Sequence, residues 1–194
     1  MRDPIRDPIR HVELADVWTT PAAEEFFRNV WPMYVHELSG FGADFYTLDA
    51  RGRWQPEIVD DWAAPVTLDE LLRETRSESD PRQPFQRAHV VLGDGVPVGF
   101  VCVSVSPFRF MAPDVDFELG EMFLVHTHRG AGVAERALGE VLSRYPGRWC
   151  LRVLPGNARA IRFWQRALPL TGARDLRHAE GDADVVWRFV VGEG

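Results

Sequence analysis

Carboxylates alternate with apolar side chains in one short segment, which is the first place where the chain could move a proton. The segment 114–119 reads DVDFEL. In a β-strand successive side chains alternate between faces, so Asp114, Asp116 and Glu118 share one face. A carboxylate beside a reacting group can act as a general base. Glu118 is therefore a candidate base, whereas Asp114 and Asp116 fit better as an acidic, solvent-exposed face at the start of a strand.

A second candidate base is Glu121, three residues beyond Glu118. In a regular strand an odd separation places two side chains on opposite faces. A β-bulge between them would bring both to one face, because a bulge inserts one extra residue into a strand. The sequence leaves both residues open as the base, with Glu118 slightly preferred, and an acidic solvent face is the alternative for Glu118.

A glycine-containing turn could bind phosphate. The segment 129–134 reads RGAGVA, follows an apolar strand and opens an amphipathic helix. Glycine lets the backbone approach a ligand, and the free N–H groups of a helix N-terminus attract anions, so a pyrophosphate fits this turn with Arg129 adding charge. The alternative is a turn that uses glycine only to change direction. The segment lacks the third glycine of a Rossmann fingerprint. It also lacks the lysine of a P-loop, because all 22 basic residues are arginine.

Two motifs in this order resemble the signatures of one family. Arg129-x-x-Gly132-x-Ala134 resembles the [Gln/Arg]-x-x-Gly-x-[Gly/Ala] signature of the GNAT superfamily of acyl-CoA N-acyltransferases. The segment 157–164, NARAIRFW, is similar to the second signature of that family, Asn-x-x-Ala-x-x-Phe-Tyr. A helix and a strand separate the two motifs, and the resemblance covers about residues 86–191.

The resemblance implies a site for acetyl-CoA as co-substrate. Amides of the turn would bind the pyrophosphate, Asn157 would hydrogen-bond the pantetheine arm, and Ala160 would let the arm pass closely. Backbone groups around Met122–Leu124 would pair with the arm and the thioester carbonyl. Asn157 also fits as the N-cap of a helix. The implied CoA-binding residues are Phe123, Leu124, Arg129, Gly130, Ala131, Gly132, Val133, Ala134, Asn157 and Ala160.

The chain departs from the family at Trp164. Many members have a tyrosine there, which protonates the departing thiolate, and an indole N–H is a poor acid. A water, Tyr145 or a nearby histidine could donate the proton instead, or CoA could leave as thiolate. His126 and His128 flank the turn, but two histidines alone are a weak metal signal, so no metal is expected.

Hydrophobic patterns predict the elements that position these residues. They give a mixed α/β sheet with crossover helices. The resemblance further implies one domain over residues 1–194, with a mostly antiparallel sheet, helices on both faces and a splayed strand pair at the CoA site. The predicted strands are Ala88–Leu92, Val96–Val105, Val115–Val125, Trp149–Leu154 and Val185–Val191, and the predicted helices are Val133–Arg144 and Asn157–Leu168.

The first 85 residues are expected to form the acceptor side, and residues 86–191 the acyl-CoA-binding core. A strand is predicted at Ile9–Leu14, followed by a helix from Pro21 that Pro32 should kink or divide. Residues 39–85 are irregular apart from a helical pattern at Leu68–Arg76, and we interpret this stretch as a candidate substrate-binding lid.

Composition limits the partners and the location. The net charge of −7 argues against nucleic-acid binding, and no apolar run is long enough to cross a membrane. The polar, proline-broken N-terminus is no signal peptide, so a cytoplasmic location is expected. Cys102 and Cys150 lie in apolar runs and are interpreted as core residues in a reducing compartment.

The leading hypothesis is an acetyl-CoA-dependent N-acetyltransferase acting on a primary amine of a small molecule. The alternatives are a peptide or protein N-terminal acetyltransferase, and a non-catalytic acyl-CoA-binding regulatory domain. A homodimer is possible by resemblance to the family, although the sequence indicates no interface.

Overall fold

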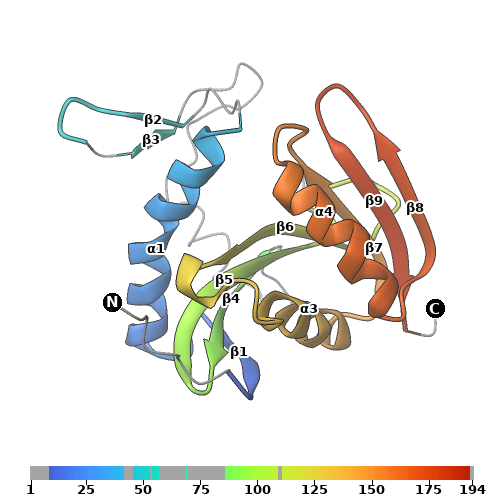
Figure 1. Cartoon of the computed structure of the whole chain (residues 1–194), viewed down its shortest axis with the longest axis horizontal. Coiled ribbons are helices and arrows are strands. Elements are labelled where there is room, and N and C mark those ends of the chain that lie inside the picture. Colours follow the sequence, from blue (N-terminus) through green and yellow to red (C-terminus); the bar gives the residue numbers. More distant parts are fainter. Residues whose placement is uncertain are drawn as a thin grey trace, which may run out of the picture.

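A seven-stranded sheet organises the chain (Figure 1). The computed structural model describes residues 9–41, 46–52, 54–56, 69, 86–108 and 111–192. The strand order is β1-β4-β5-β6-β7-β9-β8, and every neighbouring pair is antiparallel except β6 and β7. The strands are β1 Val12–Asp16, β4 Gln86–Gly93, β5 Val96–Val105, β6 Phe117–Leu124, β7 Gly147–Val153, β8 Arg174–Glu180 and β9 Val185–Val191, with a separate pair of β2 Tyr46–Leu48 and β3 Trp54–Pro56.

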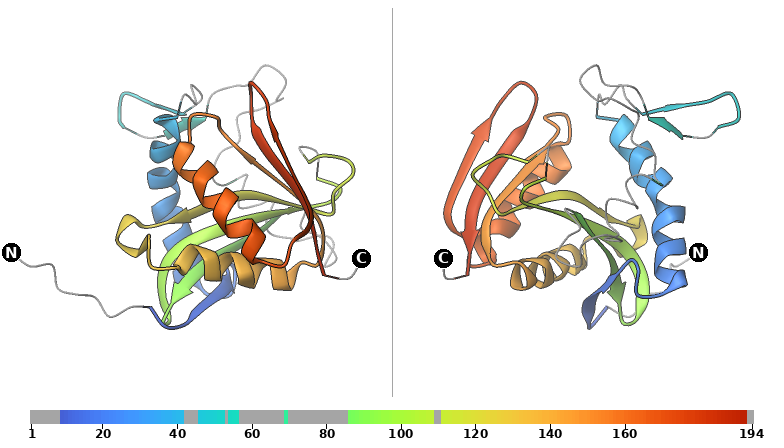
Figure 2. Two further views of the ribbon diagram at one scale, coloured as in Figure 1. Left: turned by 45° about the vertical axis from the view of Figure 1, so that its right-hand side comes forward. Right: turned by 180° about the vertical axis from the view of Figure 1, so that it is seen from behind.

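Helices cover both faces of this sheet, as predicted. Figure 2 shows α1 on one side of the sheet and α3 and α4 on the other. Two clusters of buried side chains hold these layers together: one joins α1 to β4, β5 and β6, and the other joins α3 and α4 to the opposite face. The helices are α1 Pro21–Ser39, α3 Val133–Arg144 and α4 Ala158–Ala167, with 3-10 turns η1 His126–His128 and η2 Leu168–Leu170.

The helix α1 begins where its sequence predicts. The side chain of Thr20 caps it by accepting a hydrogen bond from the Ala23 amide at 3.2 Å, and Pro21 occupies the first turn, where no intrahelical N–H partner is needed. Of the two outcomes expected at Pro32, a kink or a division of the helix, the division is excluded, since one helix runs from Pro21 to Ser39. Burial of an aromatic face against the sheet outweighs the hydrogen bond that proline removes.

The strand β6 carries the bulge that the two glutamates suggested. Cys102 of β5 lies opposite Glu121 and Val103 lies opposite Leu119, so Gly120 is the extra residue. Beyond this point β6 also leaves β7, because their parallel pairing covers only Phe117–Leu119 and Trp149–Leu151. The two strands diverge in Figure 1, which confirms the predicted splayed pair.

The remaining helices and strands agree with the bounds predicted from the sequence to different degrees. The helix at Val133–Arg144 and the strand at Val185–Val191 have the predicted bounds, whereas the first strand lies at Val12–Asp16 rather than Ile9–Leu14. The strand β8 was not predicted, because all its side chains are exposed and its sequence shows no apolar alternation. The predicted helix at Leu68–Arg76 and most of the proposed lid lie outside the described residues.

Two further expectations concern the interior and the membrane. Cys102 and Cys150 are buried free thiols, in keeping with their prediction as core residues. In the part of the chain that the structure describes, no helix is both long and apolar enough to cross a membrane.

Candidate functional site

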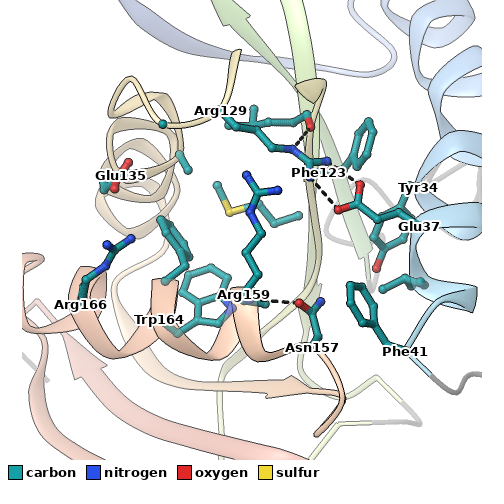
Figure 3. Close-up of a pocket in the computed structure, with 17 residues that line it drawn as sticks. Tyr34, Glu37, Phe41, Phe123, Arg129, Glu135, Asn157, Arg159, Trp164 and Arg166 are labelled. Carbon is teal, nitrogen blue, oxygen red and sulfur yellow. Dashed lines mark hydrogen bonds and ion pairs between the residues drawn. The ribbon is translucent and has the colours of Figure 1, made fainter. Parts of the chain in front are cut away.

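Two adjoining cavities open where β6 separates from β7. The first has a volume of about 260 Å³ and lies between α1, the start of α3, and α4 (Figure 3). The second has a volume of about 240 Å³ and lies between α1, β6 and β7. The cavities meet at the residues that line both: Tyr34, Leu38, Met122, Asn157, Ala160 and Trp164. A molecule that spans both cavities would therefore pass between α1 and α4.

The glycine turn leads from β6 into the N-terminus of α3. Gly130 and Gly132 have φ angles of 83° and 72°, a left-handed conformation that glycine adopts without strain. Nothing lies within 4 Å of a Cβ built on either residue, so the turn leaves room for a ligand beside its backbone. Of the predicted turn residues, Arg129, Gly130 and Ala134 line the first cavity, whereas Val133 is buried in the core.

The side chain of Arg129 is held in an ion pair that the sequence did not indicate. Its Nη1 and Nη2 atoms donate to the two carboxylate oxygens of Glu37 at 2.7 and 2.6 Å, and its Nε donates to the Leu124 carbonyl at 2.6 Å. The guanidinium also holds the pKa of Glu37 below its usual range. Arg129 therefore ties the turn to α1.

Arginines of α4 supply the positive charge that sequence reasoning missed. Arg159 and Arg166 line the first cavity, and Figure 3 shows Arg159 extending toward its middle. They are seven residues apart and therefore lie on the same side of the helix. This spacing was readable in the sequence, but that both arginines line the first cavity is seen only in the fold.

Asn157 and Ala160 lie where the second signature predicts. Asn157 caps α4, since its Oδ1 accepts from the Ala160 amide at 3.0 Å. Both residues line both cavities. The oxygen of Asn157 is thus used by the cap, and its side-chain nitrogen is the atom that could donate to a ligand.

The pairing of β6 decides which of its backbone groups face the cavities. Val125 donates to the Val98 carbonyl at 2.9 Å, and hydrogen-bonded pairs alternate along an antiparallel ladder. Phe123 consequently bonds to Phe100, while the amide groups of Met122 and Leu124 point away from β5. Met122 and Leu124, rather than Phe123, therefore have backbone groups that β5 does not use, and the Leu124 carbonyl already accepts from Arg129.

Glu118 is buried beside an arginine and lines neither cavity. Its carboxylate accepts from Arg152 Nη2 at 2.7 and 2.8 Å and from Nε at 3.0 Å. Burial raises the pKa of Glu118, although Arg152 opposes the shift. Asp114 and Asp116 pair with Arg188 and Arg148, in keeping with their prediction as an acidic surface. This ion pairing makes Glu118 the weaker of the two candidate bases.

Glu121 faces the second cavity and contacts α1. The hydroxyl of Tyr34 donates to its Oε2 atom, and burial raises the pKa of Glu121 to about 8. Without the bulge at Gly120, Glu121 would lie on the opposite face of β6 from Glu118. A carboxylate that titrates near pH 8 beside a cavity has the proton affinity that a general base needs at neutral to alkaline pH.

The other candidate proton donors lie in different places. Trp164 is buried and lines both cavities. Tyr145 lines neither, and its hydroxyl meets His89 Nε2 at 2.7 Å near the C-terminus of α3. His126 has an exposed side chain near Glu37, with 3.8 Å between Nε2 and Oε2. Among the described residues, no group of three or more potential metal ligands is gathered.

The buried pair of His89 and Tyr145 predicts a pH effect on stability. Burial lowers the pKa of His89 from 6.5 to about 4, so the unfolded chain binds a proton that the folded chain refuses between these values. Stability contributed by neutral His89 is therefore lost as the pH falls from about 6.5 to about 4, by about 3 kcal/mol in total. Glu121 has a raised pKa, so its contribution to the unfolding free energy increases as the pH falls from about 8 toward its ordinary pKa of 4.5.

Because these two effects oppose each other, the measurement compares the parent with His89→Phe in urea unfolding at pH 7 and pH 4. We expect the advantage in unfolding free energy of the parent over the variant to shrink by about 3 kcal/mol at pH 4. An advantage that does not change with pH would show that His89 is not held neutral by the fold.

The site places a splayed and bulged strand between a glycine turn and a carboxylate, an arrangement compatible with an acyltransferase. The family model described as "Acetyltransferase (GNAT) family" matches residues 48–168. This chain belongs to that family. The match begins further toward the N-terminus than the resemblance over about residues 86–191 had indicated.

Solved structures agree with this fold. An acetyltransferase from Thermus thermophilus is similar with a TM-score of 0.59 and 19% identity, covering 95% of this chain and 99% of the other. A GNAT-family acetyltransferase from Streptococcus agalactiae has a TM-score of 0.55 and 13% identity, covering 94% and 96%. At these identities the similarity establishes the fold alone. Comparison with curated protein sequences gave no match.

Proposed function

We propose that this protein transfers an acetyl group from acetyl-CoA to a primary amine of a small molecule. The observation that carries the proposal is the pair of cavities that meet between Tyr34 and Trp164, with a carboxylate of raised pKa in the second. Two substrates that enter from opposite sides would meet at this junction. Family membership supports acetyl transfer as the reaction.

The first cavity has the features that a CoA donor requires. The open space beside Gly130 and Gly132 and the N-terminus of α3 fit a pyrophosphate. Arg159 and Arg166 add the positive charge. Further along, Met122, Leu124 and Asn157 would hydrogen-bond the pantetheine arm with backbone and side-chain groups. When bound, the donor supplies an acyl group activated as a thioester.

The second cavity is suited to a small cationic amine. Glu121 and Asp184 contribute carboxylates to its lining, and Trp164 and Leu38 contribute apolar surface. An amine attacks only when neutral, so the cation first releases one proton to solvent, and a base must accept the second proton that the nitrogen loses as the amide forms. We assign this step to Glu121, whose other carboxylate oxygen, Oε1, would accept the proton while Oε2 accepts from Tyr34.

The volume of the second cavity supports the leading proposal over its main alternative. About 240 Å³ is enough for a small acceptor, whereas a peptide requires an open groove. A regulatory domain without activity would bind acyl-CoA but would not need an acceptor cavity with a carboxylate. A cytoplasmic location and a possible homodimer stay predictions.

The experiment that tests the proposal is free-thiol release from acetyl-CoA with a panel of amines, run beside calorimetric titration of acetyl-CoA. The panel contains aminoglycosides, polyamines, amino acids and short peptides. Release that depends on one small-amine class supports the proposal. Release with peptides alone would favour the peptide acetyltransferase, and binding without release from any amine would favour the regulatory domain.

A further inference from the structure

A tyrosine of α1 lies at the junction of the two cavities. Tyr34 lines both cavities and is 8% exposed. Its ring packs against Trp31, Phe100 and Phe123, with centroid separations of 5.5, 5.4 and 5.9 Å. These contacts fix the ring and direct its hydroxyl toward Glu121 Oε2. A phenol is therefore held at the place where a thioester would meet an amine.

The other candidate acids named from the sequence, Trp164 and Tyr145, are less suited to this role. Trp164 is at the junction, but its indole N–H is too weakly acidic to protonate a thiolate. Tyr145 contacts His89 at the far end of α3 and lines neither cavity. Among the side chains that the structure describes, Tyr34 is the phenol that combines an ionisable proton with contact to both cavities.

We propose that Tyr34 is the catalytic acid that protonates the departing thiolate and that Glu121 returns a proton to it, an inference that rests on the proposed function. The amine nitrogen bonds to the acyl carbon as its proton passes to Glu121. The carbon–sulfur bond breaks with its electron pair on sulfur, and Tyr34 Oη gives its proton to that sulfur. Glu121 then passes the amine proton to the Tyr34 phenolate, so amine and thioester become amide and thiol.

The hydrogen-bonding capacity of the pair permits this relay. A phenol has one proton and two lone pairs, so Tyr34 can accept from protonated Glu121 while donating to sulfur. In the structure the hydroxyl donates to the carboxylate, which is the arrangement before the amine loses its proton. Protonation of Glu121 would thus free the Tyr34 hydrogen for the leaving group.

Several charged groups surround the pair and set its pH dependence. On α1, Glu37 is one turn beyond Tyr34 and is held by Arg129. On the side of β7 and β9, Arg152 and Asp184 line the second cavity, and Arg152 also pairs with Glu118. Arg159 of α4 lines the first cavity. Glu37 and Arg152 are held in ion pairs, and Glu121 is the group beside the phenol whose pKa burial raises to about 8.

The test compares Tyr34→Phe with Tyr145→Phe, which makes the same chemical change at a buried tyrosine outside both cavities. We expect Tyr34→Phe to lower the turnover number by about 100-fold or more, the size of a general-acid effect, while the Kd for acetyl-CoA changes by no more than about twofold. Tyr145→Phe should keep turnover within about threefold of the parent, measured well below its unfolding temperature.

A second readout needs no acceptor. The ultraviolet absorption of the thiolate gives the pKa of the thiol of CoA bound to each protein. A hydrogen bond from Tyr34 stabilises the thiolate, so this pKa should be higher in Tyr34→Phe than in the parent by about one unit, and unchanged in Tyr145→Phe. Equal thiol pKa values in the parent and Tyr34→Phe, or equal turnover in the two, would overturn the inference.

Different results would contradict the proposed function itself. The proposed function is contradicted directly if the parent protein binds no CoA, or if it binds acetyl-CoA but none of the amines in the panel causes release of thiol. A parent that transfers acetyl groups to an amine, with Tyr34→Phe as active as Tyr145→Phe, leaves the proposed function standing and removes only the role of Tyr34.

Discussion

Replacing Glu121 by glutamine should slow acyl transfer by about 100- to 10,000-fold, the range of general-base catalysis, while leaving acetyl-CoA binding nearly unchanged. Glutamine has the same shape and keeps an oxygen that can accept from Tyr34, but it cannot take a proton from the amine. Turnover and calorimetric Kd, measured on the same preparation, separate the chemical step from binding.

The pH dependence of the parent provides a second measure of the same prediction. Burial raises the pKa of Glu121 to about 8, so its carboxylate is mostly protonated at pH 7 and mostly ionised at pH 9. The rate should therefore rise with pH up to about 8 and then level off. In Glu121→Gln this rise should disappear.

Variants of two further carboxylates serve as controls for the loss of turnover in Glu121→Gln. Asp116→Asn is the matched control, because Asp116 sits in an exposed ion pair with Arg148 and should not affect turnover. Glu118→Gln tests the competing base; it breaks a buried pair with Arg152, so its main cost should be in stability. Loss of turnover in Glu118→Gln, with normal folding and an active Glu121→Gln, would assign the base to Glu118 instead.

Gly132→Asp should weaken acetyl-CoA binding by about 100-fold or more, because a carboxylate would repel the pyrophosphate at the start of α3. The variant should still fold. Gly132 has a φ of 72° with open space around a built Cβ, and aspartate tolerates this left-handed conformation better than most residues. A negative charge at a helix N-terminus even offsets part of the backbone cost.

The matched control is Gly132→Asn, which has nearly the same size and conformational tolerance but no charge. It should lose only the part of the affinity that depends on space beside the backbone, so the aspartate should bind at least about tenfold more weakly than the asparagine. This difference should shrink at high salt, because screening weakens the repulsion. Equal affinity of parent and Gly132→Asp would place the phosphate elsewhere.

Local features of the sequence determined several parts of this protein. The Asp94-Gly95 turn predicts the hairpin of β4 and β5, because both residues adopt positive φ, of 49° and 78°. The bounds of α3 follow from its amphipathic period between the glycine turn and Pro146-Gly147. The two signatures identified the family because each lies in one continuous segment whose geometry is set by nearby residues.

Other features were decided only by tertiary structure. The sequence pointed to Arg129 as a phosphate-binding charge, but Glu37, 92 positions away, holds that side chain against α1. The sequence slightly preferred Glu118 over Glu121 as the base, and our proposal of Glu121 depends on the pairing of Glu118 with Arg152 of β7. Neither partner could be recognised in advance, because many acids and arginines in the chain are equally suitable by type alone.

The same limit applies to the proposed acid. Tyr34 lies in the apolar pattern of α1, which indicates a core residue, and it meets Glu121 across 87 positions of sequence. Spacing along the chain determines which side chains share a face of one helix or strand. Which faces then meet depends on how the helix packs on the sheet and on the single extra residue at Gly120, so the junction of the two cavities exists only in the folded protein.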